Sequence, residues 1–149
     1  MTTIDDMLTE DTRCRAAHGL PARTVDAALQ RTAQQLAEML AVPGAPFTHA
    51  TGGGMERRLA ANGWSGNAEG ENIAYGESTA AATFHDWMLS PGHRANILAT
   101  DTPLCGFGHA VSADGMHYWA ADYGARGAVG GSPSPRVPWW LRLLGGLMR

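Results

Sequence analysis

Histidine and cysteine are the residue types in this chain with the widest range of chemistry. The sequence has six histidines and two cysteines, whereas all 11 of its basic residues are arginine. Without lysine, the chain lacks the side-chain amine that forms Schiff bases with carbonyl substrates. Cys14 and Cys105 show no CxxC spacing, so neither a zinc ribbon nor a thiol-exchange site is indicated. The sequence leaves open whether these two cysteines form one disulfide or remain as two buried thiols.

Ser90 and His93 are near enough in sequence to suggest a nucleophile and its base. However, a serine followed by proline is typical of a helix start, where the serine oxygen caps a backbone amide. The chain also has no GxSxG elbow. We therefore predict that Ser90 caps a helix that begins at Pro91. The glycines at 52–54 lack the Gly-Lys-Ser/Thr ending of a phosphate loop, and we expect them at the rim of a cleft.

Length and charge exclude several classes of protein. A chain of 149 residues with 44% hydrophobic content is typical of one globular domain. Residues 1–126 carry 8 arginines and 14 acidic residues, so this part would repel nucleic acid and no such partner is predicted. No run of 18 apolar residues is present, which predicts no transmembrane segment. The first residues lack the basic and apolar regions of a signal peptide.

Periodicity predicts helices first and a hairpin last. Apolar residues at helical spacing predict helices over 4–17, 25–40 (with Thr24 as its cap), 55–61, and from a cap at Ser78 or Thr79 to Leu89. The segment through Glu71 is expected to be a loop. From Leu104 the period becomes two, and Asp114-Gly115 predicts a turn before a second strand over 116–123. This order indicates an α+β fold in which helices cover an antiparallel sheet.

Three strings in the sequence resemble the CAP superfamily. They are GENIAYG at 70–76, WMLSPGHRANIL at 87–98, and GFG at 106–108 with Tyr118-Trp119 after it. This superfamily comprises cysteine-rich secretory proteins, antigen 5 and pathogenesis-related 1 proteins, and the likeness is to its bacterial branch. The resemblance extends from about residue 13 to 124. It implies an α-β-α sandwich within a domain of residues 1–126, with 127–149 as a separate segment.

The resemblance also implies a site. In this family two histidines and two acidic residues share a central cleft, and the matching motifs place His49, Glu71 and His93 at three of those positions. The fourth position is Ser90, so the set of four is incomplete. Asp86 lies one helical turn before Ser90 and is a candidate for the missing acid, the alternative being an ordinary solvated helix residue. Asn72, next to Glu71 in the first motif, is expected to border the cleft.

Three interpretations of His49, Glu71 and His93 remain open. They can bind a divalent metal such as zinc, form a structural polar cluster, or act as a zinc hydrolase in which Glu71 orients or deprotonates a metal-bound water. Their separations of 22 residues do not by themselves indicate a metal site. We expect His109 and His117 to pack across the strands of the hairpin, and His85 to lie on the surface.

Residues 127–149 form a Gly/Pro/Ser-rich linker and an apolar, basic tail. Residues 136–149 can dock on a membrane surface or a partner, fold back on the domain, or stay disordered. The leading hypothesis, from the resemblance, is a module that binds a lipid, a small molecule or a protein, rather than an enzyme. The alternatives are the hydrolase and an interaction protein that acts through its tail. The family implies a secreted or extracytoplasmic location, whereas the absence of a leader leaves the cytoplasm open.

Overall fold

The computed structural model describes residues 2–127, apart from the side chains of residues 68 and 69. Within this range the chain forms five α-helices, one short 3-10 helix (η1) and four strands. In chain order the elements are α1 (Thr3–Ala16), β1 (Thr24–Val25), α2 (Ala27–Leu40), η1 (Thr51–Gly53), α3 (Met55–Ala61), β2 (Asn67–Tyr75), α4 (Ala80–Leu89), α5 (Pro91–Ile97), β3 (Leu104–Val111) and β4 (His117–Ala125).

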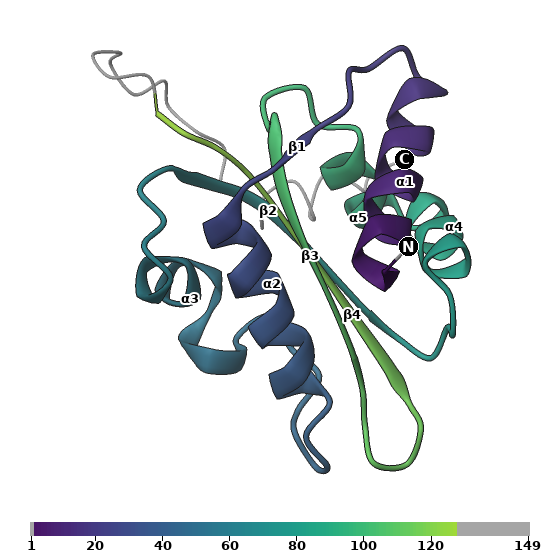
Figure 1. Ribbon diagram of the computed structural model, residues 1–149, viewed down its shortest axis with the longest axis vertical. Coiled ribbons are helices and arrows are strands. Elements are labelled where there is room, and N and C mark those ends of the chain that lie inside the picture. The colour runs from purple at the N-terminus through teal and green to yellow at the C-terminus, as the bar shows by residue number, and fades with distance from the viewer. Residues whose placement is uncertain (1, 128–149) are drawn as a thin grey trace.

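The four strands form one sheet between two layers of helices. The strand order is β1-β3-β4-β2, so β2 lies at one edge. Figure 1 shows α2 and α3 on one face of the sheet and α1, α4 and α5 on the other. This arrangement confirms the predicted α-β-α sandwich. The sheet is mixed rather than wholly antiparallel, because β1 pairs with β3 in parallel while the β2–β4 and β3–β4 pairs are antiparallel.

Two local predictions were wrong, and pairing between distant segments explains both. Asp26, not Thr24, caps α2, because its carboxylate accepts hydrogen bonds from the amides of Ala28 and Leu29. Thr24 and Val25 instead pair with β3 as strand β1, and both are exposed. The segment through Glu71, expected to be a loop, is strand β2, because β4 pairs with it along its length.

The small residues of β3 allow α2 to lie directly on the sheet. A Cβ atom added at Gly106 would lie 2.1 Å from the carbonyl carbon of Leu29. A Cβ atom at Gly108 would lie 2.1 Å from the carbonyl oxygen of Ala33. Side chains at these two positions would therefore push the helix away from the strand.

The opposite face of the sheet carries the larger apolar core. Its buried members come from α1, α4, α5 and the two central strands: Met7, Cys14, Ala80, Phe84, Trp87, Ile97, Cys105, Phe107, Trp119, Ala121 and Tyr123. Cys14 and Cys105 are both buried free thiols, which decides between the two states that the sequence left open. Burial raises the pKa of Cys105 to about 12 and keeps its thiol protonated.

Within residues 2–127, no helix combines the length and the apolar character needed to cross a membrane. The segment 136–149, for which we predicted docking, folding back or disorder, lies outside the described residues.

Candidate functional site

Glu71 is the centre of a buried polar cluster, which we define as His49, Arg58, Glu71 and Asp122. Glu71 lies on β2 and is 2% exposed. The Nδ1 atom of His49 lies 2.7 Å from Oε1 of Glu71, and the guanidinium of Arg58 donates to Oε2. Both carboxylate oxygens therefore have a donor, which a buried charge requires. Glu71 thus lies against His49, one of the two histidines that the resemblance grouped with it.

Arg58 connects the segment of His49 to the sheet. It projects from α3, and besides Glu71 it donates to the backbone carbonyls of His49, at 3.1 Å, and of Thr51. Its side chain is 3% exposed. One arginine therefore satisfies the carboxylate of β2 and holds the loop that carries His49. The sequence analysis did not identify Arg58, because nothing in a short amphipathic helix marks one arginine as buried.

Asp122 is a second buried acid, on the strand next to Glu71. It lies opposite Glu71 in the β2–β4 pairing and is fully buried. No amide, hydroxyl or cationic donor among residues 2–127 reaches its carboxyl oxygens. Burial, and then the negative charge of Glu71, raise the pKa of Asp122 well above its ordinary value. Burial therefore favours the protonated form of Asp122, which can donate a hydrogen bond to Glu71.

The sequence analysis also missed Asp122. The signal was an acidic residue within the apolar run Trp119–Tyr123, where a strand buried on both faces has no place for an unpaired charge. Such a residue must be neutral or paired, and burial beside Glu71 favours the neutral form of Asp122.

His93 lies on α5, as predicted, at the edge of the same region. Its ring centroid is 6.1 Å from that of Trp87. Burial, and then the nearby imidazole of His49, lower the pKa of His93, so its ring is neutral at pH 7. The structure therefore places His49 close enough to His93 to affect the charge of the His93 ring, although the two are 44 residues apart in sequence.

Asn72 and Asn96 fix α5 against β2. The amide nitrogen of Asn72 donates to the carbonyl of His93 at 3.1 Å, and its oxygen accepts from Asn96 at 2.9 Å. Asn96 approaches β2 closely, because Gly70 has no side chain there and a Cβ atom would lie 2.5 Å from the Asn96 oxygen. Asn72 thus positions His93 by binding the backbone of His93 rather than the imidazole ring.

A pocket of about 310 Å³ opens beside His93 at the edge strand β2. Aromatic and apolar residues dominate its lining, which consists of Phe47, Ile73, Ala74, Tyr75, Asp86, Trp87, Ser90 and His93. The rings of Phe47 and Tyr75 meet edge to face at 4.8 Å, and these residues are 42% and 57% exposed. The pocket therefore combines exposed aromatic side chains with a few polar groups.

Asp86 and Ser90 both line this pocket, and Asp86 is exposed on α4, so its role as the missing acid stays a prediction. Ser90 is also the first residue before α5, but its side chain makes no capping hydrogen bond. The predicted capping role is wrong. Pro91 favours the helix start by its fixed φ and has no amide to satisfy, so the helix begins without a side-chain cap.

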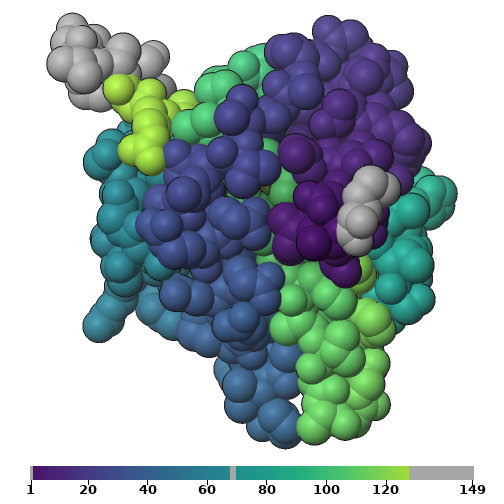
Figure 2. All heavy atoms as spheres, viewed as in Figure 1, coloured from purple at the N-terminus to yellow at the C-terminus, as the bar shows by residue number. Residues whose placement is uncertain are grey.

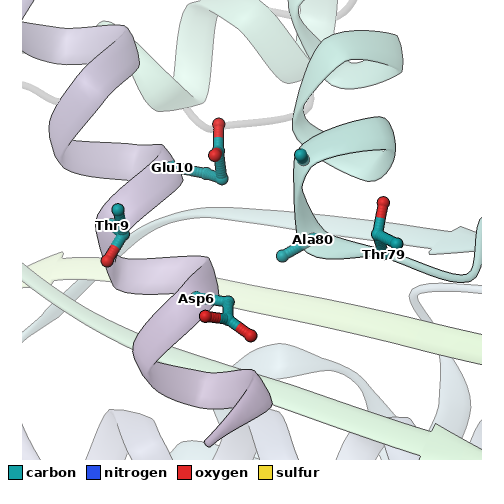
Figure 3. Close-up of a pocket in the computed structure, with 6 residues that line it drawn as sticks. Asp6, Thr9, Glu10, Thr79 and Ala80 are labelled. Atoms are coloured by element: carbon teal, nitrogen blue, oxygen red, sulfur yellow. The ribbon is translucent and has the colours of Figure 1, made fainter. Parts of the chain in front are cut away.

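A second hollow, of about 210 Å³, lies between α1 and the start of α4 (Figure 3). Asp6, Glu10 and Thr79 are among its lining residues, and it includes none of the predicted site residues.

Comparison with known proteins identifies the fold. The sequence model of the cysteine-rich secretory protein family, CAP, matches residues 12–123. The chain belongs to this family. No curated protein matches the sequence of this CAP domain.

Solved structures with the CAP fold include bacterial ones. An outer surface protein from Borrelia burgdorferi has a TM-score of 0.75 and 24% identity, over 85% of this chain and 97% of that one. An extracellular SCP-domain protein from Bacillus anthracis has a TM-score of 0.70 and 24% identity, over 84% of this chain and 40% of that one. A cysteine-rich secretory protein from Staphylococcus aureus has a TM-score of 0.63 and 18% identity, over 82% of this chain and 38% of that one.

The zinc site stays a prediction for this CAP domain. Among residues 2–127, no three His, Cys, Asp or Glu side chains are grouped so that they could hold a metal ion. As a direct ligand, Glu71 would have to share its oxygens between the ion and the two donors that they already bind, His49 and Arg58. It fits instead as the carboxylate that orients the His49 ring, a role that acids beside metal-binding histidines often have.

Proposed function

We propose that this CAP domain is an extracytoplasmic binding module whose pocket at the edge of β2 takes a small apolar or amphipathic molecule. The observation that carries the proposal is the pocket lining, in which Trp87, Phe47 and Tyr75 supply apolar surface and His93, Ser90 and Asp86 supply polar groups. Binding pockets for small molecules commonly combine apolar walls with a few placed polar groups. The extracellular and outer-surface descriptions of bacterial neighbours support the location.

The polar cluster favours binding over hydrolysis. A general base must reach a water molecule beside the bound substrate. Glu71 is 2% exposed and is not among the residues that line the pocket, whereas its two oxygens hold His49 and Arg58. We infer that the cluster holds the loop carrying His49 in place beside the pocket. No observation on residues 2–127 bears on a function carried by the tail.

Titration with palmitate, followed by intrinsic tryptophan fluorescence, tests the binding proposal. Trp87 lines the pocket and is 1% exposed, so a ligand there should change its emission. Tyr75→Ala removes part of the rim, and losing about 60 Å² of apolar contact should weaken binding about tenfold, at about 25 cal/mol per Å². Leu89→Ala is the matched control, because Leu89 is a 71% exposed apolar residue outside the lining. Equal affinities for the two variants would contradict the proposed pocket.

Glu71→Gln separates the two functions. If the domain is a binding module, this variant should keep palmitate affinity as long as it stays folded. If it is a hydrolase, the variant should lose activity on a p-nitrophenyl ester in the presence of Zn²⁺. Ester turnover by the wild type that disappears in Glu71→Gln would replace the binding proposal with the hydrolase.

A further inference from the structure

His109 and His117 form a pair on the β3–β4 hairpin, apart from the cleft. His109 lies opposite Trp119 and His117 lies opposite Val111, so the two histidines are diagonal neighbours on one face. The Nε2 atom of His109 is 2.9 Å from the Nδ1 atom of His117. Both residues are partly exposed. The lower end of the hairpin, in green, extends beyond the helices in Figure 2.

Trp119 supports both imidazole rings. Its ring centroid is 4.1 Å from that of His109 and 6.2 Å from that of His117, and it is nearly parallel to the His117 ring at 14°. Trp119 itself is fully buried, and its indole donates to the carbonyl of Glu77 at 2.7 Å. A fixed aromatic surface thus holds two ring nitrogens side by side before any ligand arrives, which lowers the ordering cost of binding.

We propose that His109 and His117 form a two-histidine site for a divalent transition metal, with Cu²⁺ as the preferred ion. Two nitrogens that bind one metal at about 2.05 Å and a right angle lie about 2.9 Å apart, whereas a tetrahedral angle requires about 3.3 Å. A hydrogen bond sets the 2.9 Å of the metal-free pair, so the spacing shows that both nitrogens can reach one ion once the rings turn, and the tetragonal geometry of Cu²⁺ accommodates two such nitrogens. Imidazole sites also bind Cu²⁺ more tightly than other divalent ions of its row.

The protons balance without a redox step. In the metal-free pair one nitrogen donates a hydrogen bond and the other accepts it. On binding, the donor ring moves its proton to its other nitrogen, both rings turn, and each directs a lone pair at the ion. Water fills the remaining coordination positions. Burial, and then the neighbouring His117, lower the pKa of His109, which favours the neutral form that a ligand requires.

Titration of the full chain with CuSO₄ at pH 7.5, followed by tryptophan quenching and electron paramagnetic resonance, tests this site. We expect one saturable equivalent that disappears in both His109→Asn and His117→Asn. It should survive in His85→Asn, which removes an exposed histidine of α4, and in the double variant His49→Asn/His93→Asn.

The nitrogen hyperfine pattern of the wild type provides an independent measurement that needs no variant. Two coordinated imidazole nitrogens are expected. A wild-type pattern with fewer than two would overturn the proposal, as would unchanged Cu²⁺ binding in folded His109→Asn. Loss of the equivalent in the cleft double variant alone would also overturn it, by assigning the ion to the cleft. None of these outcomes depends on palmitate binding, so this site and the proposed function can fail separately.

Discussion

Replacing Arg58 by methionine should destabilise the domain strongly, because Glu71 would then keep a buried charge without its main partner. The two side chains are 3% and 1% exposed, so solvent screens their interaction little. The change also removes the donor to the carbonyls of His49 and Thr51. Removing one partner of a buried ion pair typically costs about 3–5 kcal/mol. For a domain of this size that loss corresponds to a fall in Tm of about 10–20 °C.

Urea unfolding at pH 7, followed by tryptophan fluorescence, measures this cost as a free energy of unfolding. Arg57→Met is the matched control, since Arg57 is the exposed neighbour on the same helix and its loss should change the free energy by less than about 0.5 kcal/mol. In a double-mutant cycle, Arg58→Met with Glu71→Gln should cost less than the sum of the single changes by at least about 1 kcal/mol. The reasoning would be refuted if the two single changes lowered the free energy of unfolding additively. It would also be refuted if Arg58→Met lowered that free energy no more than Arg57→Met does.

Three further predictions concern protonation and packing. The native pKa of Asp122 is raised, so the folded state keeps a proton that the unfolded chain loses above about pH 4, and stability should fall as the pH rises from there. Asp122→Asn should remove this decrease in the free energy of unfolding with pH. If the free energies of the variant and the wild type changed equally with pH between pH 4 and 7, the prediction would be wrong. The native pKa of His93 is lowered, so below about pH 6.5 the unfolded chain binds a proton at this residue more readily than the folded state does. Stability should therefore fall as the pH drops. His93→Gln should reduce the loss between pH 7.5 and 5.5, as measured by urea midpoints. Gly108→Ala should cost more than about 2 kcal/mol, because the added methyl would meet the backbone of α2, whereas Gly127→Ala, whose nearest neighbour is at 3.8 Å, should be nearly neutral in thermal melts.

The helices that the sequence predicted best are those whose start and stop signals are local. The bounds of α3 match the prediction at 55–61, and α4 begins after Thr79, one of the two caps proposed. The hairpin turn at Asp114-Gly115 was also predicted, and Gly115 has the positive φ that such a turn requires. In each of these cases the information lies within a few residues of the chain.

The candidate site likewise contains residues that the sequence identified and residues that it did not. Motif resemblance singled out His49, Glu71 and His93, and the structure brings Glu71 against His49 and His93 near His49. The motif resemblance could not identify Arg58 or Asp122, because their importance comes from burial beside Glu71 rather than from any neighbour in sequence.

The sequence by itself therefore determined three residues of the candidate site, the approximate extent of most helices, and the family, since these depend on local patterns. Only the tertiary structure decided that β1 and β2 are strands, because their hydrogen bonds go to residues far along the chain. It alone decided the roles of the charged groups as well. Whether a carboxyl is ionised, paired or protonated depends on burial and on neighbours from other elements, as Glu71 and Asp122 show.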